Sequence, residues 1–118
     1  MIVLEIVKNS IIARKWHIHD IEEAVYTLVQ LIPIGCTTTY KDVANVLNIS
    51  PRLVAKLLSK NRNPIIIPCH RVIRSDGSLG GYTINGVKAP EVKRKLLEIE
   101  SNGRPCRFSL SEYLGLYH

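Results

Sequence analysis

Two apolar, β-branched runs stand at residues 2–7 and 11–18 of the chain. Lys8-Asn9-Ser10 lies between them, and short polar segments between such runs favour turns. The pattern therefore predicts a short hairpin or two paired strands over the first residues.

Helical periodicity follows over residues 21–32. Asp20 is a candidate N-cap for this helix, and Pro33 and Gly35 end the pattern. Steps of three and four place one apolar face towards a core. That face consists of Ile21, Val25, Leu28, Val29 and Ile32.

Two short helices joined by about three residues are predicted next. Thr39 with Asp42 resembles a capping box and opens a helix that ends near Asn48. Ser50-Pro51 then supplies an N-cap and a proline at the first helical position of a helix over 51–60. This layout is typical of a helix-turn-helix.

The second of these helices has an apolar face and a basic face. Leu53, Val54, Leu57 and Leu58 form the first. The second is formed by Arg52, Lys56, Ser59 and Lys60. A basic face of this kind is either a solvated surface or a nucleic-acid contact, and the periodicity alone leaves both open.

Residues 65–118 are predicted to contain an extended segment, a turn, a helix and a packed tail. The run at 65–67 predicts a buried strand or extended segment, and the segment 75–81 predicts a glycine-rich turn. A last helix is predicted over 90–102, and the tail at 104–118 is expected to pack back as a short turn or helix. The inward face of the last helix is expected to hold Val92, Leu96 and Ile99.

Composition indicates one globular domain. The chain has 118 residues, 46% of them hydrophobic and 22% charged, which suits a single core. It has no apolar run near the ~20 residues that span a membrane. It also has no recognisable signal peptide, so we expect a cytoplasmic protein. A net charge of +6 favours a polyanionic partner, and nucleic acid, anionic membrane and acidic protein remain open.

The three cysteines, Cys36, Cys69 and Cys106, are odd in number and more than thirty residues apart. Their spacing matches neither a disulfide framework nor a zinc site, so we expect no metal and at least one free thiol.

Cys69 stands between Pro68 and His70, a setting that a packing residue does not need. A reactive cysteine is a thiolate, and His70, Arg71 and Arg74 are candidates for lowering its pKa. In an extended chain Cys69 and His70 point to opposite faces, so the pair needs a turn or a bridging water. Among the following carboxylates we favour Glu100 as the group that orients His70. A buried, unreactive cysteine beside a core histidine is the alternative.

The segment NRNPIIIPCHRVIRSDGSLGGY resembles the active-site segment of the O6-alkylguanine-DNA alkyltransferases, also called methylated-DNA-protein-cysteine methyltransferases. The resemblance runs from about residue 21 to 101. It implies an α+β, mainly helical fold with a winged-helix-like helix-turn-helix over residues 20–118, preceded by an extension at 1–19. It also implies irreversible, stoichiometric alkyl transfer without a cofactor.

The resemblance implies roles for four residues of the reaction centre. Cys69 would accept the alkyl group, and His70 would take its proton through a water. Glu100 would orient His70. Asn61 matches the hinge between the recognition helix and the active-site segment.

The resemblance also implies a substrate pocket and a DNA surface. Arg52 would enter the base stack, and Tyr40 would help to rotate the 3′ phosphate. The pocket residues would be Pro64, Val72, Tyr82 and Thr83, with the Val72 carbonyl reading the guanine amino group and the Thr83 amide meeting O6. The DNA-binding residues would be Arg52, Lys56, Ser59, Lys60 and Arg71.

The implied partner is double-stranded DNA containing O6-alkylguanine, with O4-alkylthymine as a second candidate lesion, bound by a monomer through the minor groove. Many family members carry an additional N-terminal domain, and this chain has Gly35-Cys36 where the family has Gly-Glu. A sensor that binds the lesion without repairing it is therefore the first alternative. A helix-turn-helix regulator that reads the major groove is the second.

Overall fold

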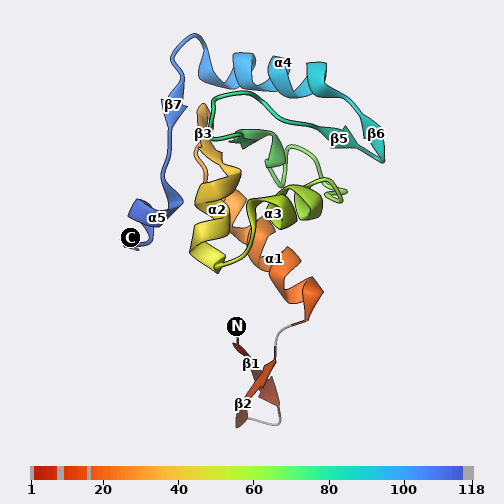
Figure 1. Cartoon of the computed structure of the whole chain (residues 1–118), viewed down its shortest axis with the longest axis vertical. Coiled ribbons are helices and arrows are strands. Elements are labelled where there is room, and N and C mark those ends of the chain that lie inside the picture. Colours follow the sequence, from red (N-terminus) through yellow and green to blue (C-terminus); the bar gives the residue numbers. More distant parts are fainter. Residues whose placement is uncertain (1, 8–9, 16, 116–118) are drawn as a thin grey trace.

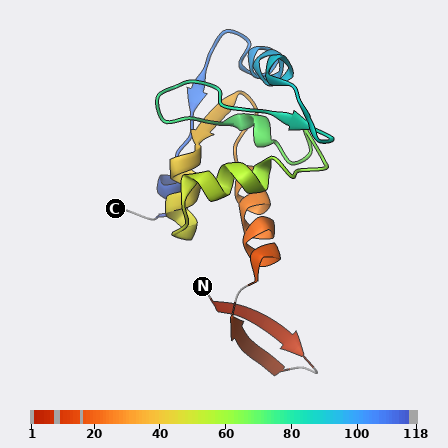
Figure 2. The ribbon, with the colours of Figure 1, turned by 45° about the vertical axis from the view of Figure 1, so that its right-hand side comes forward.

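The computed structural model describes residues 2–7, 10–15 and 17–115. Strands β1 (Ile2–Val7) and β2 (Ser10–Lys15) pair antiparallel, with Val7 opposite Ser10. The predicted hairpin is therefore confirmed, although β2 ends at Lys15 and residue 16 lies outside the described residues. Figures 1 and 2 show this hairpin beyond the N-terminal end of α1, at one end of the molecule.

Helix α1 (Ile18–Val29) starts three residues before the predicted position. The N-cap is His17, and the Asp20 carboxylate accepts a hydrogen bond from the His17 amide over 2.7 Å. Asp20 therefore stabilises the first turn from inside the helix and is not the N-cap itself. The predicted apolar face is buried: Ile21, Val25, Leu28, Val29 and Ile32.

The two predicted helices of the helix-turn-helix are present as α2 (Tyr40–Leu47) and α3 (Pro51–Leu58). The Thr39 hydroxyl accepts the Asp42 amide over 3.0 Å, and the Ser50 hydroxyl accepts the Leu53 amide over 3.1 Å. Asn48 turns the chain in the left-handed conformation, with φ 55°. Helix α3 is two residues shorter than predicted, and the Tyr26 hydroxyl anchors it to α1 by donating to the Leu57 carbonyl.

The segment around Cys69 leads into an edge strand of a three-stranded parallel sheet, which fixes its position. Strand β3 (Cys36–Thr39) lies between β4 (Val72–Ile73) and β7 (Cys106–Arg107). A 3-10 turn, η1 (Cys69–Arg71), leads directly into β4. Helix α4 (Pro90–Ser101) lies at the end of the molecule opposite the β1–β2 hairpin, and α1, α2 and α3 lie between the two (Figures 1 and 2). Both α1 and α4 contact η1.

A small antiparallel hairpin precedes α4. Strands β5 (Thr83–Ile84) and β6 (Val87–Lys88) pair with Thr83 opposite Lys88. The glycine-rich segment before them is irregular, as predicted, and Gly77 and Gly80 have positive φ angles. No helix among the described residues is long and apolar enough to cross a bilayer.

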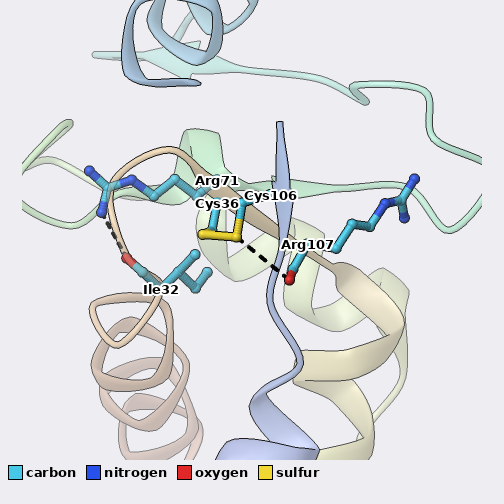
Figure 3. The surroundings of a disulfide bond; sticks show 5 residues. All are labelled: Ile32, Cys36, Arg71, Cys106 and Arg107. Carbon is cyan, nitrogen blue, oxygen red and sulfur yellow. Dashed lines mark hydrogen bonds between the residues drawn. A yellow bond between two sulfur atoms is a disulfide. The ribbon is translucent and has the colours of Figure 1, made fainter. Parts of the chain in front are cut away.

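A disulfide joins Cys36 and Cys106, whose Cα atoms are 4.3 Å apart (Figure 3). The prediction that the cysteine spacing fits no disulfide was therefore wrong. The two residues are 70 positions apart in sequence, but parallel pairing of β3 with β7 places them opposite each other. Cys69 is the free, buried thiol, so the prediction of at least one free cysteine is confirmed.

The tail packs back as predicted, through β7 and helix α5 (Leu110–Tyr113). The Asp42 carboxylate accepts hydrogen bonds from the Leu110 amide over 2.7 Å and from the Ser111 hydroxyl over 2.8 Å. A disulfide at one end and a carboxylate cap at the other therefore hold the tail against β3 and α2.

The prediction of a buried strand or extended segment at 65–67 was wrong, because Ile65 and Ile66 lie in a turn. Ile65 and Ile66 are exposed, and Ile65 has a φ of 76°, which is unusual for a β-branched residue. The Asn61 side chain donates to the Ile67 carbonyl and accepts the Asn63 amide, which folds the segment into a turn. An apolar run thus forms a surface turn because one buried asparagine supplies its hydrogen bonds.

Candidate active site

Cys69 opens the 3-10 turn η1 and is 6% exposed. The Asn61 side-chain amide donates to its sulfur over 3.3 Å. Burial raises the pKa of the Cys69 thiol, while the Asn61 hydrogen bond and the positive charge of Lys93 oppose that rise. The site therefore shields the thiol and supplies groups that stabilise the thiolate once it forms.

His70 and Arg71 share the carboxylate of Glu100. His70 Nε2 lies 3.0 Å from Glu100 Oε1, and Arg71 contacts both carboxylate oxygens, over 2.9 and 2.8 Å. These hydrogen bonds, that of Arg71 first, lower the pKa of Glu100 against the effect of burial. Burial lowers the pKa of His70, which favours the neutral ring.

The carboxylate also determines the tautomer of His70. Because Glu100 accepts, Nε2 carries the proton of the neutral ring, and Nδ1 is left with a free lone pair. Nδ1 is buried and has no hydrogen-bond partner among the described residues. Within residues 17–115, the structure describes no hydrogen bond between the side chains of Cys69 and His70. The two residues lie in the 3-10 turn η1, which is one of the two arrangements expected for the pair, and the bridging water stays a prediction.

Lys93 is a buried residue of this site that the sequence reasoning missed. It is 0% exposed on α4, and its ammonium donates to the Val72 carbonyl over 2.7 Å, to the Tyr40 hydroxyl over 3.2 Å and to the Gly81 carbonyl over 3.3 Å. Burial lowers its pKa to about 8. Lys93 stands seven positions before Glu100, two helical turns along one face, and that spacing was the available signal.

The predicted inward face of α4 was correspondingly wrong. Val92 and Ile99 are exposed, and Leu96 is partly buried. Lys93 and Glu100 point inward instead, because each finds charged or polar partners under η1 and β4. The inward side of α4 therefore consists of two hydrogen-bonded ionic groups together with Leu96 from the predicted apolar face.

A hollow of about 110 Å³, here called the Cys69 pocket, opens above the sulfur. Its lining includes four residues predicted for the reaction centre and the substrate pocket: Tyr40, Cys69, Tyr82 and Thr83. Helix α3 closes another side with Ala55 and Ser59. The Tyr82 hydroxyl is buried without a hydrogen-bond partner among the described residues, and burial raises its pKa to about 12.

Two residues predicted for the pocket do not line it. Pro64 is half-buried and pairs with Ile67 in the turn before Cys69. Val72 is buried, and its carbonyl accepts the Lys93 ammonium. A carbonyl has two lone pairs, so this contact leaves one for another donor.

The residues predicted to bind DNA separate into two groups. Arg52 and Lys56 on α3 are exposed, and so are Ser59 and Lys60 in the turn that follows the helix. The structure does not place Arg71 on that surface: it is 8% exposed, it pairs with Glu100, and it donates to the Ile32 carbonyl over 2.9 Å (Figure 3). Its guanidinium thus links η1 to the segment after α1 and to α4, and its hydrogen bonds are made within the protein.

Among the described residues, no group of three or more histidine, cysteine, aspartate or glutamate side chains could hold a metal ion. The chemistry that this arrangement supports is that of a shielded thiol with a neutral histidine as base.

Sequence comparisons agree with this geometry. Residues 20–102 match the family model described as "6-O-methylguanine DNA methyltransferase, DNA binding domain". Over 79 residues the chain is 56% identical to the Methylated-DNA--protein-cysteine methyltransferase of Pyrobaculum aerophilum, a match that covers 64% of this chain and 51% of that protein. The chain spans about half the length of the curated relatives that it matches.

Structural comparisons give the same fold. The Mycobacterium tuberculosis OGT in complex with DNA superposes with a TM-score of 0.64 at 34% identity, over 78% of this chain and 54% of that one. The S. pombe protein Atl1, in complex with damaged DNA containing O6-carboxymethylguanine, superposes with a TM-score of 0.62 at 25% identity, over 72% of this chain and 79% of that one. The α+β, mainly helical fold is thus confirmed, and by the family model that matches most of its length, the chain belongs to the 6-O-methylguanine DNA methyltransferase family.

Proposed function

We propose that this protein repairs DNA directly, by moving the alkyl group of O6-alkylguanine irreversibly to Cys69. The observation that carries the proposal is the free thiol at the Cys69 pocket, beside Asn61 and the His70–Glu100 pair. In the reaction a bond forms between the Cys69 sulfur and the alkyl carbon as the bond from that carbon to O6 breaks. Because a thioether is a poor leaving group, each molecule reacts once.

His70 is the base in this proposal. The thiol proton passes through a water to the free lone pair of Nδ1, and Glu100 stabilises the imidazolium that results. Lys93 and the Asn61 amide stabilise the thiolate before the substrate binds. The guanine leaves as an anion at O6 and N1 and takes up a proton from water, while the thiol proton stays on His70.

The substrate base must leave the duplex to reach a buried sulfur. Tyr40, Tyr82 and Thr83 form the walls that receive it, and Arg52 fills the gap in the stack. Pro64 and the Val72 carbonyl complete the pocket in the family pattern. O4-alkylthymine is a second candidate lesion for the same pocket.

Double-stranded DNA is the proposed partner, bound by a monomer through the minor groove. Arg52 and Lys56 on α3, with Ser59 and Lys60 in the turn after it, face the DNA backbone. Residues 20–118 form the catalytic and DNA-binding unit, and residues 1–19 are an extension of it. A cytoplasmic location and a reaction without a cofactor complete the proposal.

The test is the intact mass of the full chain after incubation with duplex DNA containing O6-methylguanine. We expect a gain of one methyl group, about 14 Da, on the peptide that holds Cys69, and no gain in Cys69→Ala. Transfer that persists in Cys69→Ala would refute the proposal.

A lesion sensor that does not transfer the group is the second candidate. The match to Atl1, which was solved in complex with damaged DNA and is covered over 79% of its length, is compatible with binding to a lesion. The assembled Cys69, His70 and Glu100 favour repair. Tight binding to the methylated duplex with no mass gain would identify a sensor.

A further inference from the structure

A second hollow, of about 440 Å³, adjoins the Cys69 pocket. Lys41, Arg52 and Arg74 line it, and we name it the cationic hollow. It shares Tyr40 and Gly81 with the Cys69 pocket, so the two hollows open side by side. Three positively charged side chains therefore line a hollow directly beside the Cys69 pocket.

Lys41 and Arg52 belong to the helix-turn-helix, but Arg74 comes from the segment after β4. It directly follows β4, in a turn where its amide donates to the Ser78 carbonyl over 2.9 Å and its carbonyl accepts the Gly77 amide over 3.0 Å. The Asp76 carboxylate ties this turn by accepting the Ser78 amide and hydroxyl. The backbone of Arg74 is thus fixed while its side chain is exposed.

The loop that follows Arg74 packs against Tyr40, which lines both hollows. Gly80 has a φ of 74°, and a Cβ there would lie 3.1 Å from the Tyr40 hydroxyl oxygen. The charge of Arg74 lowers the pKa of Lys93 and opposes the rise in the pKa of Tyr40. Asp76 is the acidic group beside Arg74, and its carboxylate accepts hydrogen bonds from Ser78. Among the described residues, no salt bridge holds the Arg74 guanidinium.

We propose that Arg74 binds a backbone phosphate of the nucleotide whose base enters the Cys69 pocket. A guanidinium binds a phosphodiester through two parallel hydrogen bonds. Arg74 and Arg52 line the same hollow from different elements, so the two can contact one strand beside the Cys69 pocket. This inference rests on the proposed function for the identity of the base. The phosphate contact itself needs no lesion, so it can be tested apart from repair.

The first experiment measures the affinity of the full chain for an unmodified duplex by fluorescence anisotropy, over a range of salt concentrations. We expect Arg74→Gln to bind about fivefold to tenfold more weakly at about 0.1 M salt, and the slope of log affinity against log salt to decrease by about 0.9. Arg74→Lys should keep most of the slope, since it keeps the charge. Arg104→Gln is the matched control: Arg104 is exposed after α4 and lines neither hollow.

The second experiment compares alkylation of Cys69 by methylated duplex and by free O6-benzylguanine, which has no phosphate. In Arg74→Gln we expect the ratio of the duplex rate to the free-base rate to fall about fivefold at subsaturating DNA. Thermal unfolding checks that Arg74→Gln is folded, and Arg74→Lys is the rescue.

The outcomes separate the two proposals. A wild-type chain that transfers no methyl group refutes the proposed function, and the salt slopes still decide on Arg74. Equal slopes for Arg74→Gln and Arg104→Gln, with or without transfer, overturn the phosphate contact.

Discussion

The buried charged cluster beside Cys69 differs from the exposed basic surface of α3 and the turn after it in whether its charges have partners inside the protein. His70, Arg71, Lys93 and Glu100 all have partners inside the protein, through hydrogen bonds or ion pairs. Arg52, Lys56 and Lys60 are exposed, and within residues 17–115 no ion pair engages them. Charges of the first kind are part of the fold, whereas charges of the second kind remain available to a polyanion. Substitutions in the two regions should therefore change different measurements.

The largest effect is expected for Glu100→Gln. It leaves Arg71 and His70 buried without their carboxylate, and removing one partner of a buried pair costs about 3 kcal/mol or more. Urea denaturation should show this loss of unfolding free energy. Glu98→Gln, an exposed change on the same helix, is the control and should stay within about 0.5 kcal/mol. Similar losses in both variants would remove the distinction between the two regions.

Acid should act on the buried cluster through His70 and Glu100. The folded pKa of His70 lies below 6.5, so stability falls as the pH drops below that value and the unfolded chain takes up the proton first. The folded pKa of Glu100 lies below 4.5, so its contribution is present above that value and is lost as the pH falls through the lower, folded pKa.

Thermal melts between about pH 7 and pH 3 measure both steps. Glu100→Gln should weaken the dependence below 4.5 relative to the wild-type chain. An unchanged pH profile in this variant would show that Glu100 does not contribute to the acid sensitivity.

Arg52→Ala should act on DNA and leave folding unchanged. If Arg52 fills the stack behind a flipped base, it offsets an unstacking cost of a few kcal/mol, so the rate with duplex substrate should fall at least about tenfold. The rate with free O6-benzylguanine should fall much less. Equal losses on the two substrates would exclude this role.

The smallest effect is expected for Lys56→Gln. One lost phosphate contact lowers the salt slope of DNA binding by about 0.9 and weakens affinity severalfold, with a change in stability within about 0.5 kcal/mol. Anisotropy titrations and a melt of the same sample measure both quantities. A large loss of stability would show that this face also supports the fold.

The helix-turn-helix could be predicted from sequence because its signals are local. Thr39 and Ser50 cap their helices as their types and positions predict, and Pro51 stands at the first helical position. These contacts join residues three positions apart, so the sequence pattern contains both partners.

The second half of the chain depends on partners far apart in sequence. Arg71 was predicted to bind DNA, but a carboxylate 29 residues away binds it. The run at 65–67 was assigned to the core on its composition, but Asn61 turns it outward. Of the candidate site, the pairing of His70 with Glu100 could be expected from the family pattern, while Lys93, Arg74 and the disulfide required the tertiary arrangement.

Because of the disulfide, the free-thiol content of a sample can report how much of the protein has not yet reacted. With Cys36 and Cys106 joined, Cys69 is the one thiol that can be titrated in an oxidised, unfolded sample. If each molecule reacts once at that thiol, the thiol content of a sample equals its remaining repair capacity. Adding a reductant would release the other two sulfurs, and the assay would then overstate the unspent fraction.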